Sequence, residues 1–228
     1  MSNPVTSRAV STPAHEHDAV VRSLKSRLCD VGREFYSRGW VFGTSGNFSA
    51  TLNRDPLLLG ITATGLDKGS LAPEQFLEID DAGNVLRGDG KPSAETALHL
   101  EVVRERNAGC VLHTHSVWST VLSGIHAAQG GLAIEGYEML KGLSGIQTHE
   151  HREWLPIIEN SQYMAPLARI VSDTLKQHPS AHGFLLKEHG LYTWGVDIAE
   201  ARRHVEILEF LMETLVRRGE ALAPRERS

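Results

Sequence analysis

Histidine is the residue type in this sequence with the clearest capacity for metal chemistry, because twelve histidines occur in 228 residues. Six of them form three His-x-His pairs, namely His15/His17, His113/His115 and His149/His151. On a β-strand, residues i and i+2 face the same side, about 6.5–7 Å apart along the chain. Two imidazoles in that arrangement can reach one metal ion, so the surroundings of each pair must decide between them.

The surroundings favour His113/His115, because the apolar run 108–112 leads directly into this pair and helical periodicity resumes at Ser116. Both rings are therefore expected at a rigid edge of the core, where a preorganised site belongs. His15/His17 lies near the polar N-terminus, where ordering two ligands costs backbone entropy. His149/His151 lies in a polar stretch typical of a solvated loop. From spacing alone, the alternative that a pair is simply two hydrogen-bonded polar residues stays open.

A third metal ligand is predicted at His189, which lies at an expected tight turn between two apolar strands. Loops displayed by a rigid sheet are where functional residues concentrate. Three neutral imidazoles leave a zinc ion with an open position, which is the arrangement of a catalytic site rather than a structural one. His99 belongs to the helix expected to begin at Ser93, and a packing or surface role is predicted for it.

Three clusters of small residues, 43–47, 62–65 and 91–95, are candidates for binding a phosphate. Such segments expose backbone N–H groups and hydroxyls without bulk in the way, as anion sites require. Ser93 is expected to cap a helix, whose N-terminus favours a bound anion. Each cluster alone is typical of a turn or a cap. Together with a metal site, the three clusters make a phosphate site an interpretation that rivals turns and caps. Neither a P-loop nor a dinucleotide fingerprint is present.

Two glutamates are the main candidates for moving protons. Glu95 could be a metal ligand, a general base, or a favourable charge in the first turn of its helix. Glu138 lies in an apolar segment flanked by glycines, and apolar surroundings raise a carboxyl pKa into the range that suits proton transfer. The alternative for Glu138 is a surface residue paired with Lys141. Three further glutamates remain rivals or framing residues: Glu135, Glu188 and Glu159.

The elements that must position these residues follow from periodicity. Helices are predicted from about His17 to Gly39 and over 93–107, 116–125, 164–177 and 198–218, with strands over 47–52, 57–64, 76–79, 85–87, 154–159, 183–187 and 191–194. Hairpins mixed with helices, without regular βαβ alternation, predict an α+β fold with a mainly antiparallel sheet. We expect one domain over 15–228, behind a loose arm at 1–14.

Composition excludes several other classes of protein. Hydrophobic residues make up 41% and charged residues 22%, which is typical of a folded, soluble chain. The 23 basic and 28 acidic residues give a net charge of −5, which argues against general nucleic-acid binding. Two cysteines make no disulfide framework. The expected location is cytoplasmic, because no apolar run approaches a membrane span and the first residues lack the order of a signal peptide.

In this order along the chain, five motifs resemble the class II aldolase family: Gly43-Thr44-Ser45-Gly46-Asn47, Thr62-Ala63-Thr64-Gly65, Pro92-Ser93-Ala94-Glu95, His113-Thr114-His115 and Glu188-His189-Gly190. The similarity spans about residues 20–217. Two further stretches, 137–142 and 155–160, resemble the methylthioribulose-1-phosphate dehydratase branch of that family. The resemblance implies a three-layer α/β/α fold, one zinc ion per subunit and a homotetramer with its site near a subunit boundary.

Residue by residue, the resemblance assigns zinc binding to His113, His115 and His189, and acid/base catalysis to Glu138. It places the phosphate of the substrate at five residues: Ser45, Asn47, Thr64, Gly65 and Ser93. Glu95 matches an aldolase base that can also bind zinc. Ala94 departs from the pattern, because aldolases usually have a second serine there.

The implied reaction converts 5-methylthioribulose 1-phosphate to 2,3-diketo-5-methylthiopentyl 1-phosphate and water, in methionine salvage. The alternatives are a sugar-phosphate aldolase, a pentulose-phosphate epimerase, or a non-catalytic interaction module with a vestigial site.

Overall fold

Nine strands form one sheet in the part of the chain that the computed structural model describes, residues 14–222. Their bounds are β1 Asn47–Arg54, β2 Leu57–Thr62, β3 Phe76–Ile79, β4 Val85–Arg87, β5 Cys110–Thr114, β6 Gly131–Glu135, β7 Arg152–Ile158, β8 Gly183–Leu186 and β9 Gly190–Gly195. Their order across the sheet is β4-β3-β2-β1-β5-β9-β8-β7-β6. All neighbouring pairs are antiparallel except β7 and β8. The mainly antiparallel sheet predicted from the sequence is therefore confirmed.

Five α-helices accompany the sheet within the same described range: α1 Ala14–Ser37, α2 Thr96–Arg106, α3 Val117–His126, α4 Met164–Gln177 and α5 Ile198–Leu222. Four short 3-10 turns lie between them: η1 Lys68–Ser70, η2 Pro73–Gln75, η3 Ala127–Gln129 and η4 Glu138–Gly142. The predicted N-terminal arm lies outside the described residues except for its last position, and the single domain from residue 15 stays a prediction. None of the helices in residues 14–222 combines the length and the apolar composition needed to cross a bilayer.

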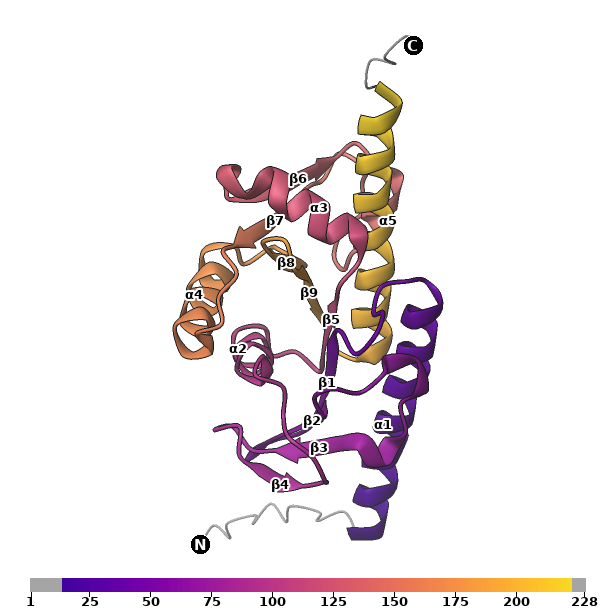
Figure 1. The fold of residues 1–228 in the computed structure, drawn as a ribbon, viewed down its shortest axis with the longest axis vertical. Coiled ribbons are helices and arrows are strands. Elements are labelled where there is room, and N and C mark those ends of the chain that lie inside the picture. The colour runs from indigo at the N-terminus through magenta and orange to yellow at the C-terminus, as the bar shows by residue number, and fades with distance from the viewer. Residues whose placement is uncertain (1–13, 223–228) are drawn as a thin grey trace, which may run out of the picture.

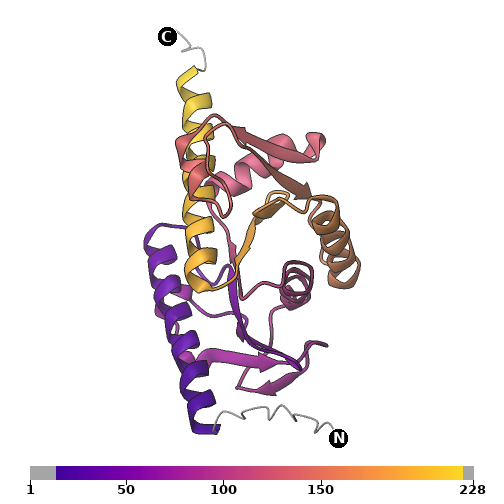
Figure 2. The same ribbon diagram turned by 180° about the vertical axis from the view of Figure 1, so that it is seen from behind.

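The helices cover both faces of the sheet, as the two ribbon views show (Figures 1 and 2). Helices α1 and α5 lie side by side on one face, and α3 packs against α5 there. Helices α2 and α4 pack against each other on the other face. The expected three-layer arrangement, with helices on both sides of a central sheet, is confirmed.

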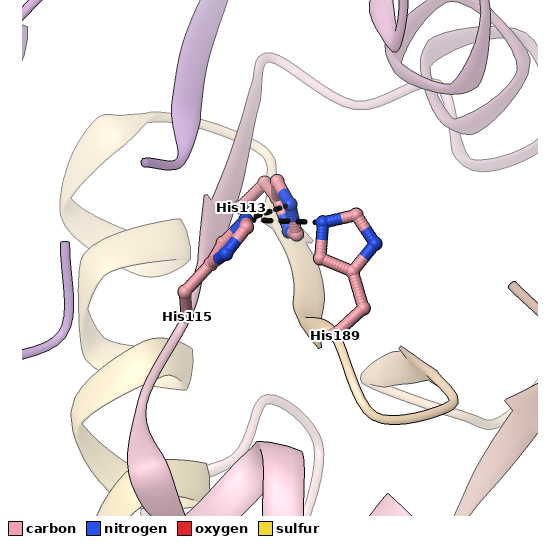
Figure 3. A group of neighbouring side chains, drawn as sticks. All are labelled: His113, His115 and His189. Carbon is pink, nitrogen blue, oxygen red and sulfur yellow. Dashed lines mark hydrogen bonds between the residues drawn. The ribbon is translucent and has the colours of Figure 1, made fainter. Parts of the chain in front are cut away.

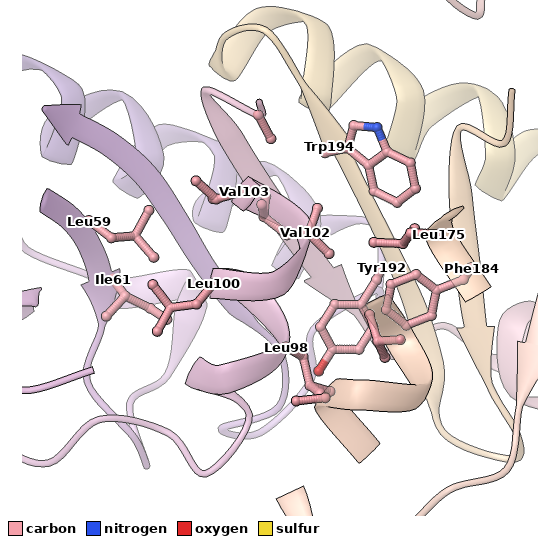
Figure 4. Close-up of a cluster of buried hydrophobic side chains, with 14 of the residues drawn as sticks. Leu59, Ile61, Leu98, Leu100, Val102, Val103, Leu175, Phe184, Tyr192 and Trp194 are labelled. Carbon is pink, nitrogen blue, oxygen red and sulfur yellow. The ribbon is translucent and has the colours of Figure 1, made fainter. Parts of the chain in front are cut away.

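The alternation of side chains along the strands gives the sheet an apolar surface on both faces. In β5, Val111 belongs to the core cluster beneath α2 and α4, part of which is drawn in Figure 4. Its neighbours Cys110 and Leu112 belong to the cluster beneath α1 and α5. Because successive strand residues point to opposite faces, His113 must share the face of Val111, whereas Thr114 must share that of Leu112.

Several predicted elements are confirmed, and two details of the prediction are wrong. The turn at 80–84 closes a β3–β4 hairpin, with the Asp80 carboxylate accepting from the backbone N–H of Ala82 at 3.0 Å and of Asn84 at 2.8 Å. Strand β6 was not predicted; it pairs with β7 at one edge of the sheet. Ser93 is not the cap of α2, because the helix begins at Thr96 with Glu95 at the capping position.

Candidate active site

His113 and His115 stand at the end of β5, a strand bordered by β1 and β9. Its register aligns His113 with Asn47 on one side and with Tyr192 on the other. The side chain of Thr114 points to the opposite face, where its hydroxyl donates to Glu209 Oε1 at 3.0 Å. The two histidines therefore share one face of the sheet, as the i, i+2 spacing predicted.

His189 completes a group of three imidazoles from the turn between β8 and β9, as Figure 3 shows. The Nε2 atom of His115 lies 2.8 Å from that of His113 and 3.2 Å from that of His189. These ring nitrogens belong to a group whose candidate ligand atoms all lie within 4.8 Å of one another. The structure thus brings together His113, His115 and His189, the three histidines predicted from the sequence as metal ligands.

The protonation of these rings fits a metal ion. His113 Nδ1 donates its proton to the Leu191 carbonyl at 3.0 Å, so the Nε2 atom of the neutral ring presents a lone pair to the other two. Burial lowers the pKa of His113 well below its usual value and that of His115 to about 4. Burial also lowers the pKa of His189. Three neutral imidazoles in one place are the donor set of a divalent transition metal with an open coordination position.

Gly190 allows β5 and β9 to lie close together beside the metal ligands. A Cβ atom at this position would lie 2.1 Å from the Thr114 carbonyl oxygen and 3.0 Å from His113 Cε1. We expect Gly190→Ala to force the strands apart, at a cost of about 1–3 kcal/mol in unfolding free energy, and to weaken binding of a divalent metal ion by ~10-fold or more. Denaturant unfolding and zinc titration measure the two effects.

The control for this variant is Gly219→Ala in α5, where a Cβ atom meets nothing within 4 Å. It should leave zinc affinity unchanged and raise stability slightly, because alanine is the better helix former. An unchanged stability and zinc affinity for Gly190→Ala would contradict the prediction.

Glu95 lies beside the three imidazoles at the start of α2. Its Oε1 atom is 3.2 Å from His189 Nε2, and its Oε2 atom is 3.7 Å from His113 Nε2. At these distances the carboxylate can bind the same metal ion or accept a proton from a molecule bound to it. The third possibility raised by the sequence, a charge that only favours the helix terminus, does not account for its approach to two ligand rings.

A buried chain of hydrogen bonds fixes the orientation of Glu95. Asn47 Nδ2 donates to Glu95 Oε2 at 2.6 Å, and Asn47 Oδ1 accepts from His99 Nε2. With its Nε2 proton committed, His99 accepts at Nδ1 from the Ser49 hydroxyl at 2.8 Å. Burial lowers the pKa of His99 to about 3, so the ring stays neutral and the chain of donors keeps one direction. His99 therefore packs in the core, as expected, and also positions Glu95.

The position of His99 four residues after Glu95 on α2 was the available signal for this role, because i and i+4 share a helix face.

Tyr192 adds a second buried group beside Glu95. Its ring stacks on His113 with 3.9 Å between centroids. Burial and then the nearby Glu95 raise the pKa of the phenol, so its O–H stays protonated, and it has no hydrogen-bond partner among the described residues.

A cavity of about 190 Å³ opens in front of His115 and His189. Its wall contains all the residues predicted to contact substrate: Ser45, Asn47, Thr64, Gly65, Ser93 and Glu95. The three small-residue clusters, which are far apart in sequence, meet here because they flank β1, β2 and α2. The structure brings the candidate phosphate ligands into one cavity with two of the candidate metal ligands, His115 and His189, and the third, His113, lies buried beside them.

Lys68 also lines this cavity, and it was not among the predicted site residues. Its side chain is only 1% exposed, and its ammonium donates to the carbonyls of Leu66 at 2.6 Å and Thr44 at 3.1 Å. Burial lowers its pKa to about 8. A buried ammonium with two neutral acceptors retains one N–H for an anion. The signal in the sequence was a lysine three residues after the Thr64-Gly65 turn.

Glu138 lies outside this cavity, on η4, with its side chain 71% exposed. It accepts a hydrogen bond from Lys141 Nζ at 2.7 Å and lies 3.8 Å from His149 Nδ1. The hydrogen bond from Lys141 lowers its pKa. The expectation of a pKa raised by apolar surroundings is therefore wrong for the single chain, because the segment exposes this carboxylate to water beside a cation.

Comparison with known proteins places this architecture in one family. The sequence profile described as "Class II Aldolase and Adducin N-terminal domain" matches residues 26–216, which include all three histidines and Glu95. The chain belongs to the class II aldolase family. This confirms the resemblance stated from the five motifs.

Relatives within the class II aldolase family agree with this assignment. The chain is 44% identical over 191 residues to a methylthioribulose-1-phosphate dehydratase of Pseudomonas savastanoi pv. phaseolicola, covering 83% of this chain and 92% of the relative. It is 42% identical over 198 residues to a methylthioribulose-1-phosphate dehydratase of Methylococcus capsulatus, and the match covers 86% of this chain and 95% of that relative. These enzymes support the prediction of a metal-dependent lyase, which is confirmed at that level.

The solved structures agree on the fold of this class II aldolase family member. An L-fuculose-1-phosphate aldolase from Thermus thermophilus superposes with a TM-score of 0.71 at 24% identity, covering 90% of this chain and 100% of the aldolase. At that identity the likeness carries the fold alone. It matches the expected class II aldolase-like architecture.

Proposed function

We propose that this protein is a zinc-dependent dehydratase that converts 5-methylthioribulose 1-phosphate to 2,3-diketo-5-methylthiopentyl 1-phosphate and water, as a step of methionine salvage. The observation that carries the proposal is the cavity lined by His115, His189 and Glu95 together with Lys68 and the phosphate-type loops. His113 lies buried beside it and completes the group of three imidazoles. The relatives named as methylthioribulose-1-phosphate dehydratases supply the substrate.

The residues that line the cavity offer two kinds of contact to such a substrate, one to its phosphate and one to its carbonyl end. Ser45, Thr64 and Ser93 offer hydroxyls, Gly65 offers backbone without side-chain bulk, and Lys68 offers a positive charge. Together they would hold the phosphate on C1. That placement sets the neighbouring C2 carbonyl and C3 hydroxyl toward the histidines. A bound zinc ion would polarise the C2 carbonyl and make the C3 hydrogen acidic.

Proton transfer then falls to carboxylates of the chain. Loss of the C3 proton, with departure of the C4 hydroxyl as water, leaves an enol that becomes the 2,3-diketone. Glu95 is the carboxylate inside the cavity of the single chain, held at an angle fixed by Asn47. Glu138 is assigned the acid/base role by resemblance, and we propose that assembly brings it to the site of a neighbouring subunit.

Exposed apolar side chains on α3 and next to Glu138 support such an assembly. Val117, Val121 and Ile125 are exposed at successive i+4 positions along α3, and Met139 beside Glu138 is also partly exposed. An apolar stripe on a helix is typical of a face that packs against another protein surface. We propose a homotetramer of this chain as the occupant, with the site near a subunit boundary, and a cytoplasmic location for the enzyme.

The direct test is to incubate the zinc-loaded protein with 5-methylthioribulose 1-phosphate and identify the product. Diketone formation is expected, with one water lost per substrate. Release of an aldehyde would instead indicate cleavage of the C3–C4 bond by an aldolase, and return of an isomeric sugar phosphate would indicate an epimerase. No turnover of any of these substrates would leave the interaction module as the surviving alternative.

Lys68 gives a prediction specific to the phosphate end of the cavity. We expect Lys68→Met to raise KM by about 10–100-fold, which corresponds to the ~1.5–3 kcal/mol of one charged hydrogen bond. The same variant should weaken competitive inhibition by inorganic phosphate by a similar factor. Steady-state kinetics measure both effects.

The matched control is Lys176→Met on α4, where the lysine is exposed and pairs with Glu105 at 3.2 Å. It should change neither KM nor phosphate inhibition. If Lys68→Met lowered kcat alone and left phosphate inhibition intact, the ammonium would not be a phosphate ligand.

A further inference from the structure

A second cavity, of about 390 Å³, lies apart from the first and has no lining residue in common with it in the described chain. Its wall is built from the segment before β7, the connection from α4 to β8, the end of β9 and the start of α5. Two histidines at its edge, His151 and His182, flank the buried carboxylate of Glu153. These three residues have no part in the proposed reaction.

The three side chains point to a common centre. Glu153 Oε2 lies 2.9 Å from His151 Nε2 and 2.9 Å from His182 Nδ1. One candidate ligand atom from each residue lies within 4.8 Å of the other two. Glu153 is only 1% exposed, and its other oxygen accepts the backbone N–H of His182 at 2.9 Å. The carboxylate is therefore held in place from behind, with one oxygen left to face both rings.

The contacts of His182 turn its Nδ1 atom toward the carboxylate of Glu153. Its Nε2 atom donates to the Ser144 carbonyl at 2.9 Å, and its Nδ1 atom faces Glu153 Oε2 at 2.9 Å. In the charged ring Nδ1 donates a proton to that oxygen, and in the neutral ring it presents a lone pair to it. Two lone pairs facing each other at 2.9 Å repel unless a proton or a metal ion lies between them. His113 shows the same arrangement at the first site, where one ring nitrogen donates to a carbonyl and the other faces the metal position.

Ser144 is itself held rigidly, which makes the orientation of His182 well defined. The backbone N–H of Ser144 donates to His204 Nε2 at 3.1 Å, while His204 Nδ1 donates to the Trp194 carbonyl at 2.7 Å. The Ser144 hydroxyl donates to Glu200. Outer partners of this kind orient the ligands of metal sites and set their basicity.

We propose that His151, Glu153 and His182 bind a second divalent transition-metal ion, with Zn²⁺ as the expected occupant. Two imidazoles and one carboxylate are a recognised zinc donor set, and the adjoining cavity leaves room for water at a fourth position. The sequence indicated a solvated loop for His149/His151. The structure divides that pair, because His149 is exposed whereas His151 faces a carboxylate at the beginning of β7.

The position of the site predicts what such an ion does. His151 and Glu153 lie at the beginning of β7, and His182 directly precedes β8. The β7–β8 pair is the parallel junction of the sheet and is paired through Ile157↔Leu185 and Ile158↔Leu186. A metal ion shared by these segments would clip the junction together and stabilise the attachment of β6 and β7 to the rest of the sheet.

The test uses metal-free full-length protein titrated with Zn²⁺ against a chromophoric chelator. We expect two zinc ions per chain in the unsubstituted protein and one in His113→Ala, which removes the first site. In the His113→Ala background, His151→Ala should weaken the remaining ion by at least the ~10–100-fold that loss of a supporting partner costs. Co²⁺ bound to that background should show the visible absorption of a site with nitrogen and oxygen ligands.

His149→Ala in the same background is the control, because His149 is an exposed neighbour outside the cluster. It should leave the second ion in place. Glu153→Gln is a second test variant that keeps the shape of the buried side chain while removing its charge, and it should also lose the ion. One zinc per chain in the unsubstituted protein with none in His113→Ala would overturn the proposal. So would an ion retained at full affinity in His151→Ala.

Discussion

His113→Ala should remove the bound zinc of the first site and, with it, nearly all turnover of 5-methylthioribulose 1-phosphate. The ring is fully buried, and its Nε2 atom lies 2.8 Å from that of His115. Polarisation by a metal ion contributes several kcal/mol to such reactions, and each ~1.4 kcal/mol is tenfold in rate. We therefore expect a rate loss of ~10³-fold or more.

Elemental analysis and product formation measure the two effects in the same preparation. Because Tyr192 stacks on His113, the alanine variant also loses packing in the core. His189→Ala serves as the second variant, since this residue lies on the β8–β9 turn rather than within a strand. Zinc bound at the first site with unchanged affinity in both variants would refute the metal centre.

Glu138→Gln should retain zinc and fold but lose about 10²–10⁴ in turnover, the usual contribution of a positioned acid or base. Because Glu138 is exposed in the single chain, an experiment with mixed chains tests more directly whether it acts in a neighbouring subunit. If Glu138 acts in a neighbouring subunit, a mixture of inactive Glu138→Gln and inactive His113→Ala chains should regain activity, because some sites then combine an intact metal centre with an intact Glu138.

Glu135→Gln is the matched control, since Glu135 is similarly exposed and lies 3.6 Å from Arg152. It should keep full activity. If Glu138→Gln turned over at the rate of the unsubstituted enzyme, Glu138 would be the surface residue that its contact with Lys141 indicates. Glu95 would then be the remaining candidate for proton transfer. Failure of the mixed chains to recover would instead place the action of Glu138 within its own subunit.

Most helices and strands could be predicted from the sequence, because hydrophobic periodicity identifies the faces of these elements that are buried. The β5 run and the β8–β9 hairpin were predicted to within a few residues, and both of them present metal-ligand candidates. Strand β6 was missed. Its burial depends on pairing with β7 and packing beneath α3. These are tertiary contacts, and the sequence pattern of a five-residue segment does not predict them.

Site residues that lie in a recognisable motif could be predicted from the sequence. Site residues whose environment is formed by distant segments of the chain could not. His113, His115 and His189 stood out by spacing and context. Lys68 looked like an ordinary charged residue, because its burial against the Thr44 and Leu66 carbonyls exists only in the folded chain. The environment of Glu138 was misjudged for a related reason. Apolar neighbours in sequence do not bury a carboxylate when the backbone turns it outward.

The central place of β5 in the sheet links the active site to the folding of the whole chain. The strand that ends in the metal ligands is paired with β1 on one side and with β9 on the other. The cavity draws its wall from residues as distant as Thr44 and His189. No fragment ending before the β8–β9 turn contains a complete site, so a newly made chain acquires its metal affinity late. Binding of a metal ion there would stabilise the native state as a whole, because only that state holds all three imidazoles together.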